Sequence, residues 1–222
     1  LGCDVTMINC NGDGNFTRVA EPLAENLKDL EEKVLEVGAD IGFATDPDGD
    51  RLSIVSNMGQ AIGEEYTLVL AFKNFINYQD SEIVTNLSTS RMIDDISSGS
   101  IRTKIGEAHV VEKMKELNID IGGEGNGGII LKEVHLGRDS LVGVSMILNL
   151  LSKDNKSIDE IISGIPEYIF IKDKINIDDS IDFDSLATVF NCDEINRSDG
   201  IKFSWPEKWI HIRKSNTEPI IR

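Results

Sequence analysis

The sequence lacks the features that mark several common protein classes. No apolar run approaches the length needed to cross a lipid bilayer. Its three cysteines are odd in number and show no CxxC spacing, which is typical of reduced thiols in a cytoplasmic protein. The three histidines are scattered without metal-ligand spacing. The sequence therefore predicts a cytoplasmic protein with neither a membrane span nor a histidine or cysteine metal site.

Basic residues are also scarce. Lys and Arg number 22 against 39 Asp and Glu, which gives a formal net charge of −17. This charge argues against nucleic acid or a membrane as a partner, because both are anionic. The net negative charge is still compatible with an anionic substrate if Arg and Lys are concentrated in the binding site. With 222 residues and 40% hydrophobic content, the chain can form one large domain or two to three smaller ones.

The start of the chain lacks two further features. It begins Leu-Gly-Cys-Asp, with neither an initiator methionine nor a signal-peptide pattern. This start predicts a fragment of a longer protein.

What the sequence does contain is a concentration of carboxylates in one short turn. Asp46, Asp48 and Asp50 alternate in Asp-Pro-Asp-Gly-Asp-Arg, which we call the acidic turn (Asp46–Arg51). Apolar runs at 41–44 and 52–55 flank it and predict short buried strands. Three neighbouring like charges repel one another, and a hard cation such as Mg²⁺ or Ca²⁺ would remove that repulsion. A solvated acidic surface turn is the alternative that the spacing leaves open.

An EF-hand calcium loop also begins with alternating aspartates. With Asp46 at its first position, the loop would need Gly at the sixth position and Glu at the twelfth. The chain has Arg51 and Asn57 there, and the flanking runs predict strands instead of helices. The EF-hand is therefore excluded.

The first part of the chain predicts a βαβ unit. Residues 5–8 predict a strand, a helix opens at Pro22 and ends at Gly38, and residues 41–45 predict a second strand. A right-handed parallel connection would join the two strands. The acidic turn would then lie at the carboxyl end of a strand, where open α/β sheets bind ligands.

The middle of the chain predicts a second α/β unit, and the tail predicts a small α+β domain. The helices expected in the middle unit cover 64–78, 90–98, 107–117, 141–151 and 157–163, and its strands cover 82–87, 101–105 and 119–121. The tail is expected to contain an extended segment at 168–177, a helix at 181–190, and strands at 201–204 and 209–212.

Five glycines occupy the seven positions 122–128, which we call the glycine loop. Glycine permits positive φ angles and a close approach of the backbone to a ligand. Glu124 and Asn126 would project from this loop, and their carboxylate and amide groups suit the hydroxyl groups of a sugar. A glycine-rich hairpin with two incidental polar side chains is the alternative.

The end of the chain is rich in hydrogen-bond donors. We call residues 213–222 the basic loop, and its candidate phosphate ligands are Arg213, Ser215, Asn216, Thr217 and Arg222. Arginine binds phosphate in a bidentate manner, and hydroxyl and turn amide groups add directional donors. In so acidic a chain, this cluster favours a phosphate site over a solvated loop.

Together, the three loops resemble those of the α-D-phosphohexomutase family, which includes phosphoglucomutase, phosphomannomutase and phosphoglucosamine mutase. The acidic turn is similar to the magnesium loop of that family, the glycine loop to its sugar-recognition loop, and the basic loop to its phosphate loop. Asp13-Gly14-Asn15-Phe16 and Gly137-Arg138-Asp139 resemble archaeal-type members.

The resemblance implies mixed-sheet α/β domains followed by a small α+β domain. Residues 1–62 would be the end of the second domain, 63–163 the third domain, and 164–222 an incomplete fourth domain. The family's first domain carries the serine that becomes phosphorylated, and this chain contains no matching loop. That missing domain of the same protein is therefore an implied partner.

The resemblance also implies an activity. Family members are isomerases of carbohydrate metabolism that interconvert hexose 1-phosphate and hexose 6-phosphate through a bisphosphate intermediate and a phosphoserine. The implied Mg²⁺ ligands are Asp46, Asp48 and Asp50. Arg51 would be catalytic at the same phosphate, Glu124 and Asn126 would hold sugar hydroxyls, and the basic loop would hold the non-reacting phosphate. Without the serine, this chain alone is predicted to be inactive.

The chain departs from the family pattern at two positions. Many relatives have Ser in place of Asn126, and some have His in place of Gly128, so the general acid/base is unassigned. Lys104 and Glu107 lie in a turn that contributes to the cleft in relatives. Phosphomannomutase/phosphoglucomutase activity is favoured, with phosphoglucosamine mutase or a non-catalytic phosphosugar-binding module as alternatives. The sequence leaves the hexose and the oligomeric state open.

Overall fold

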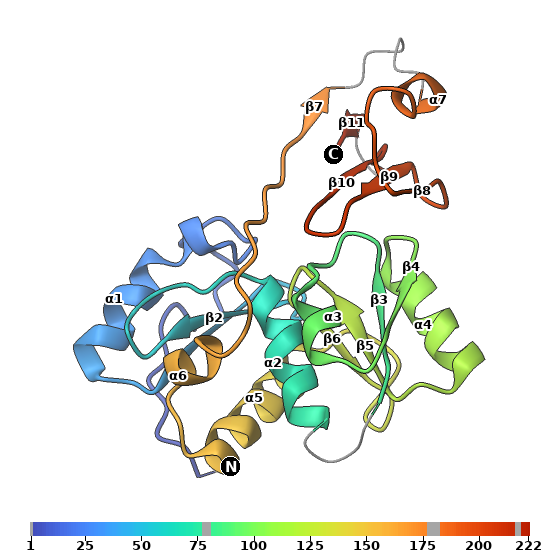
Figure 1. The fold of residues 1–222 in the computed structure, drawn as a ribbon. Helices are drawn as coiled ribbons and strands as arrows, with labels where there is room; N and C mark the ends of the chain where they lie inside the picture. The colour runs from blue at the N-terminus through green and yellow to red at the C-terminus, as the bar shows by residue number, and fades with distance from the viewer. Residues whose placement is uncertain (1, 77–80, 177–182, 216–218) are drawn as a thin grey trace.

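A computed structural model describes residues 2–76, 81–176, 183–215 and 219–222 (Figure 1). The chain passes through a first unit that contains a helix and a hairpin, then a larger α/β unit, and then a small unit of short strands. None of the described helices is long and apolar enough to span a membrane.

The first unit is built around one antiparallel hairpin. A 3₁₀ turn at Ala24–Asn26 leads into α1 (Lys28–Val37), which ends at Gly38 in the left-handed conformation, as predicted. The strands β1 (Ile41–Thr45) and β2 (Leu52–Ser56) then pair in antiparallel register, with Thr45 opposite Leu52. The acidic turn therefore closes a hairpin.

The strand predicted at residues 5–8 was wrong, and with it the parallel βαβ unit. Residues 2–7 form no regular structure, and Val5 and Met7 are 75% and 74% exposed. A strand needs a neighbouring strand to satisfy its backbone groups, and none of the described strands pairs with this segment. The helix also begins later than predicted, because Leu23 is extended, with a ψ of 152°, and the 3₁₀ turn at Ala24–Asn26 comes between it and α1.

The second unit confirms the predicted mixed-sheet α/β class. Its sheet has the order β4-β3-β5-β6, in which β3 runs parallel to β4 and β5 while β6 runs antiparallel to β5. The strands are β3 (Ile83–Asn86), β4 (Ser100–Thr103), β5 (Ile121–Glu124) and β6 (Gly128–Leu131). The helices are α2 (Glu65–Ile76), α3 (Met92–Ile96), α4 (Glu107–Leu117), α5 (Ser140–Asp154) and α6 (Ile158–Ile162).

Two hydrophobic clusters cover this sheet. The larger one joins α2 and α5 to β3, β5 and β6, and it also includes Leu52 and Ile54 from β2. The smaller one packs Val110 and Met114 of α4 against Val84 and Ile130. Because β2 contributes to the larger cluster, the acidic turn is anchored to the second unit as well as to the first.

The third unit consists of short strands and one small helix, in keeping with the predicted α+β tail. A sheet of order β10-β9-β8 contains β8 (Glu194–Asn196), β9 (Ile201–Ser204) and β10 (Trp209–Ile212). A second pair joins β7 (Ile175–Asn176) to β11 (Ile220–Ile221), and α7 spans Phe183–Leu186. The unit is hydrogen-bonded to the second unit by Ser88 Oγ to His211 Nδ1 at 2.7 Å, and by the Ile105 amide to Asp199 Oδ2 at 2.8 Å.

Candidate functional site

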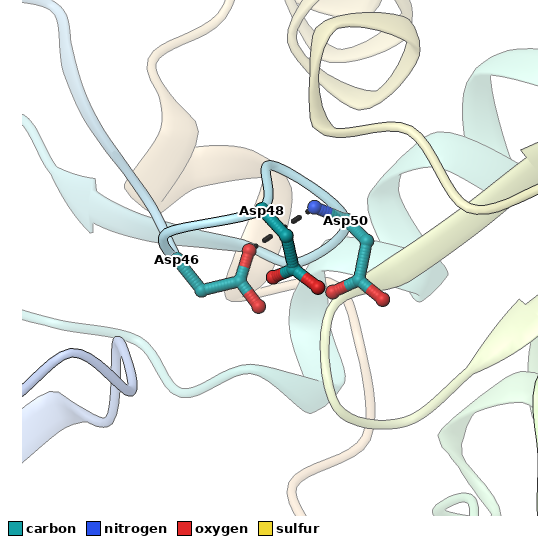
Figure 2. Close-up of side chains that lie close together, drawn as sticks. All are labelled: Asp46, Asp48 and Asp50. Carbon is teal, nitrogen blue, oxygen red and sulfur yellow. Dashed lines mark hydrogen bonds between the residues drawn. The ribbon is translucent and has the colours of Figure 1, made fainter.

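The acidic turn gathers three carboxylates around one point (Figure 2). Asp46 Oδ1 accepts hydrogen bonds from the amides of Asp50 at 3.1 Å and Arg51 at 3.0 Å, which fixes the bend. One carboxylate oxygen from each of Asp46, Asp48 and Asp50 lies within 4.8 Å of the others. The structure therefore brings the three aspartates of the sequence analysis together, and the shape depends on the turn's own backbone.

The electrostatics of the turn fit a cation. Burial raises the pKa of Asp50 to about 6, the neighbouring Asp46 adds to the rise, and the Arg138 guanidinium opposes it. Asp50 Oδ1 is buried and finds no hydrogen-bond donor among the described residues. A buried carboxylate oxygen without a donor is costly, and because Arg51 Nε lies 3.7 Å from Asp50 Oδ1, beyond hydrogen-bond distance, a coordinated cation would satisfy this oxygen better. The oxygen-only donor set is the kind that Mg²⁺ prefers, so the residues present fit that ion.

Arg51 lies beside these carboxylates. Its Nε is 3.6 Å from Asp46 Oδ2 and 3.7 Å from Asp50 Oδ1, and its Nη1 donates to Glu21 Oε1 at 2.8 Å. The Arg51 side chain is 30% exposed, so an anion could reach the guanidinium from solvent. Its position is compatible with the role that the resemblance implies.

The glycine loop places Glu124 differently from the sequence expectation. Glu124 is the last residue of β5 and is 3% exposed, so it does not project from the loop. Its Oε1 accepts from Asn86 Nδ2 at 2.7 Å and from the Gly106 amide at 2.9 Å. Asn126 is half-buried in the turn between β5 and β6, where its Oδ1 accepts from the Gly128 amide at 3.2 Å.

The acidic turn and the glycine loop are joined through residues that lie next to them. Leu52, directly after the acidic turn, donates its amide to the Gly127 carbonyl of the glycine loop at 3.0 Å, and the Ser140 amide at the start of α5 donates to the Gly49 carbonyl at 3.0 Å. The Arg138 side chain forms ion pairs with both Asp50 and Glu124. In the sequence, Arg138 stands out only as part of the run Gly137-Arg138-Asp139 that resembles archaeal relatives, and no sequence signal indicates its partners.

The basic loop closes a short hairpin in the third unit. The backbones of Arg213 and Arg222 exchange hydrogen bonds at 3.0 and 2.9 Å, and the Ser215 amide donates to the Ile220 carbonyl at 2.9 Å. Arg213 is 9% exposed, Ser215 is half-buried and Arg222 is exposed. The other two predicted ligands, Asn216 and Thr217, lie outside the described residues.

Glu65 is a further acidic residue at this site that the sequence analysis did not single out. It begins α2, is 6% exposed, and accepts a hydrogen bond from the Ser90 amide at 2.9 Å. A Cβ atom at Gly125 would lie 2.2 Å from Glu65 Oε2, so only glycine lets this carboxylate pack against the loop. Burial raises the pKa of Glu65 to about 7, and the Lys172 ammonium opposes the rise.

Glu65→Gln is expected to change how the free energy of unfolding depends on pH. The folded chain binds this proton more tightly than the unfolded chain, because the folded pKa of about 7 exceeds the ordinary 4.5. Protonated Glu65 therefore adds to the free energy of unfolding. This stabilisation is fully present below pH 4.5 and is lost as the pH rises through 7. The loss amounts to about 3 kcal/mol. Glutamine stays neutral at every pH. The free energy of unfolding of Glu65→Gln, measured by urea unfolding, should therefore not decline over this pH range.

A matched control uses an exposed glutamate on a helix that belongs to the other hydrophobic cluster. Glu112→Gln on α4 should keep the wild-type decline in unfolding free energy. An equal decline in Glu65→Gln and Glu112→Gln would contradict the raised pKa of Glu65.

Comparison with known proteins identifies related sequences along most of the chain. Residues 1–59 match the family described as phosphoglucomutase/phosphomannomutase, alpha/beta/alpha domain II, and residues 63–168 match its alpha/beta/alpha domain III. The phosphoglucomutase/phosphomannomutase of Thermococcus kodakarensis is 35% identical over all of this chain and 51% of its own length. A probable phosphoglucosamine mutase of Methanopyrus kandleri is 30% identical over all of this chain and 52% of its own length.

A solved structure shares the fold. A phosphoglucomutase/phosphomannomutase family protein from Burkholderia thailandensis superposes with a TM-score of 0.76 at 24% identity, covering 91% of this chain and 45% of that protein. The chain spans about half the length of the curated relatives it matches. The two adjoining domain matches, together with similarity to named mutases over the whole of this chain, show that it belongs to the phosphoglucomutase/phosphomannomutase family of α-D-phosphohexomutases.

Proposed function

We propose that this chain carries the metal, sugar and phosphate loops of a phosphohexomutase that interconverts hexose 1-phosphate and hexose 6-phosphate. The observation that carries the proposal is that Arg138 binds both Asp50 of the acidic turn and Glu124 of the glycine loop, while the Leu52 amide, directly after the turn, donates to the Gly127 carbonyl at 3.0 Å. A metal turn and a loop suited to sugar hydroxyls thus form one site, which a solvated acidic turn would not require.

Asp46, Asp48 and Asp50 would hold Mg²⁺. When bound, this ion would offset the negative charge of the phosphoryl group during transfer. The donor-free Asp50 Oδ1 supports this assignment. Arg51 would bind an oxygen of the same phosphoryl group, since its guanidinium lies beside the carboxylates and is partly exposed.

The remaining loops would orient the substrate. Asn126 would contact sugar hydroxyls directly. Glu124 would accept hydrogen bonds from them with the lone pairs of its carboxylate oxygens that are not already bound to donors in the protein. The non-reacting phosphate would be held by Arg213, Ser215, Asn216, Thr217 and Arg222. A fixed phosphate anchor supplies positioning at the reacting end of the sugar.

The proposed division of the chain follows from these loops. Residues 1–62 would form the end of one domain, 63–163 the next and 164–222 most of a third. The boundary between the two domain matches near residue 60 supports the first division. The phosphorylated serine would come from a further domain, so this chain by itself is proposed to lack turnover.

The favoured activity is that of a phosphomannomutase/phosphoglucomutase, as in the Thermococcus relative. Phosphoglucosamine mutase activity is the second candidate, because the Methanopyrus relative carries that name. The phosphates of glucose, mannose and glucosamine differ at carbon two, so kinetics of a protein that includes the serine domain on these three phosphosugars would distinguish the candidates.

Calorimetric titration with glucose 1-phosphate tests the proposal on this chain. Arg213→Gln is expected to weaken binding by about 10-fold or more, since it removes charge-assisted hydrogen bonds to phosphate. The control is Arg197→Gln, an exposed arginine in the same unit, which should leave binding unchanged. Absence of phosphosugar binding, or equal affinity in the two variants, would contradict the phosphate site. Turnover by this chain alone would contradict the proposal that the phosphorylated serine comes from a further domain.

A further inference from the structure

Arg138 lies at the centre of a cluster of carboxylates. It follows β6 and precedes α5, and its side chain is 14% exposed. Its Nη2 binds Asp50 Oδ2, its Nη1 donates to Glu124 Oε2 at 3.0 Å, and its Nε donates to Glu107 Oε2 at 3.0 Å. One guanidinium therefore connects the acidic turn, the end of β5 and the start of α4.

The glycine loop is shaped to accept this arginine. A Cβ atom at Gly128 would lie 2.2 Å from Arg138 Cδ, so only glycine leaves room for the arginine stem there. The guanidinium then offers its N–H groups in a rigid planar fork, which can bind several carboxylates in fixed directions. An ammonium group on a flexible stem could not hold the same three partners.

Arg138 also decides which oxygen atoms its partners can offer to a ligand. Asp50 Oδ2 is occupied by Arg138, while Asp50 Oδ1 has no donor among the described residues. Glu124 Oε2 is occupied by Arg138, while Glu124 Oε1 accepts from Asn86 and the Gly106 amide. A shift of Asp50 would therefore move Arg138 and change the hydrogen bonding of Glu124.

We propose that Arg138 is a positioning residue that couples the acidic turn to the glycine loop, so that a cation bound at Asp50 orders the loop that contacts the sugar. This inference rests on the proposed function, since it takes the acidic turn as a cation site. Coupling of this kind is reciprocal, so a ligand on the glycine loop would strengthen cation binding by the same factor.

Amide hydrogen exchange of residues 123–128, with and without Mg²⁺, tests the coupling. In the wild-type chain, Mg²⁺ is expected to slow this exchange about five-fold or more. Arg138→Met removes both the charge and the planar fork, and Arg138→Lys keeps the charge but lacks the fork. Both variants should therefore lose the response. Mn²⁺ paramagnetic resonance reports cation binding in each variant, and exchange in α2 reports whether the core is folded. A full response in Arg138→Met would overturn the proposal.

A second measurement needs no cation, so it separates this proposal from the proposed metal site. Asp50→Asn should speed exchange of the Gly106 amide, which donates to Glu124, in the wild-type background. In the Arg138→Met background the same substitution should have no further effect. An equal effect in both backgrounds would overturn the role of Arg138. Absence of Mn²⁺ binding to the wild-type chain would instead contradict the metal site.

Discussion

Asp48→Asn is expected to weaken Mg²⁺ binding by at least about 100-fold, because loss of a direct ligand exceeds the loss caused by altering a ligand's supporting group. Asp48 is exposed, whereas Asp46 shapes the turn by accepting two amides. Removing the Asp48 charge should therefore alter the cation site while the hairpin stays folded. In a protein that also contains the serine domain, phosphosugar turnover should fall by a similar factor, since the ion is expected to offset charge in phosphoryl transfer.

Mn²⁺ paramagnetic resonance or calorimetry measures the affinity. Asp40→Asn is the matched control, because Asp40 is an exposed aspartate just before the opposite end of β1 and should leave cation binding unchanged. Equal cation affinity in Asp48→Asn and Asp40→Asn would show that the acidic turn is a solvated turn and not a metal site.

Gly127→Ala is expected to lower the free energy of unfolding by about 4 kcal/mol. Gly127 has a φ of +86°, and a Cβ atom there would lie 2.3 Å from the Leu52 carbonyl oxygen. The contact is with backbone that also forms the 3.0 Å hydrogen bond from the Leu52 amide to the Gly127 carbonyl. The added methyl group would therefore separate the glycine loop from β2 or strain both.

Gly63 offers a closely matched control. Its φ is +87°, but a Cβ atom there would meet no other atom within 4 Å. Gly63→Ala should therefore cost only the backbone strain of about 1 to 2 kcal/mol. Urea unfolding of the two variants separates strain from close packing, and equal stability losses would contradict the close approach of the glycine loop to β2.

The acidic turn could be predicted from the sequence because its geometry is local. A few consecutive residues supply the carboxylates, and the side chain of Asp46 fixes the bend through amides four and five residues later. The helix α4 was likewise found at Glu107–Leu117, where apolar periodicity placed it. Local backbone chemistry is thus enough to define single elements and single turns.

The strand predicted at residues 5–8 shows where such patterns fail. A run of β-branched and apolar residues indicates that a segment can be extended, but it does not supply the neighbouring strand that would pair with it. For the same reason the sequence could not show that β1 pairs with β2 in antiparallel register. Burial of Glu124 was missed because a glycine-rich sequence does not reveal where a strand ends.

The sequence by itself determined the three loops and the kinds of ligand that each one suits, because carboxylates, amides and guanidinium groups have fixed chemistry. Only the tertiary structure decided that the acidic turn and the glycine loop lie side by side. Arg138 reaches Asp50 across 88 positions of the chain, and Glu65 packs against Gly125. Such contacts depend on how α2 and α5 pack against the sheet and against β2. The periodicity of one segment cannot specify that packing, because it describes a face and not its partner.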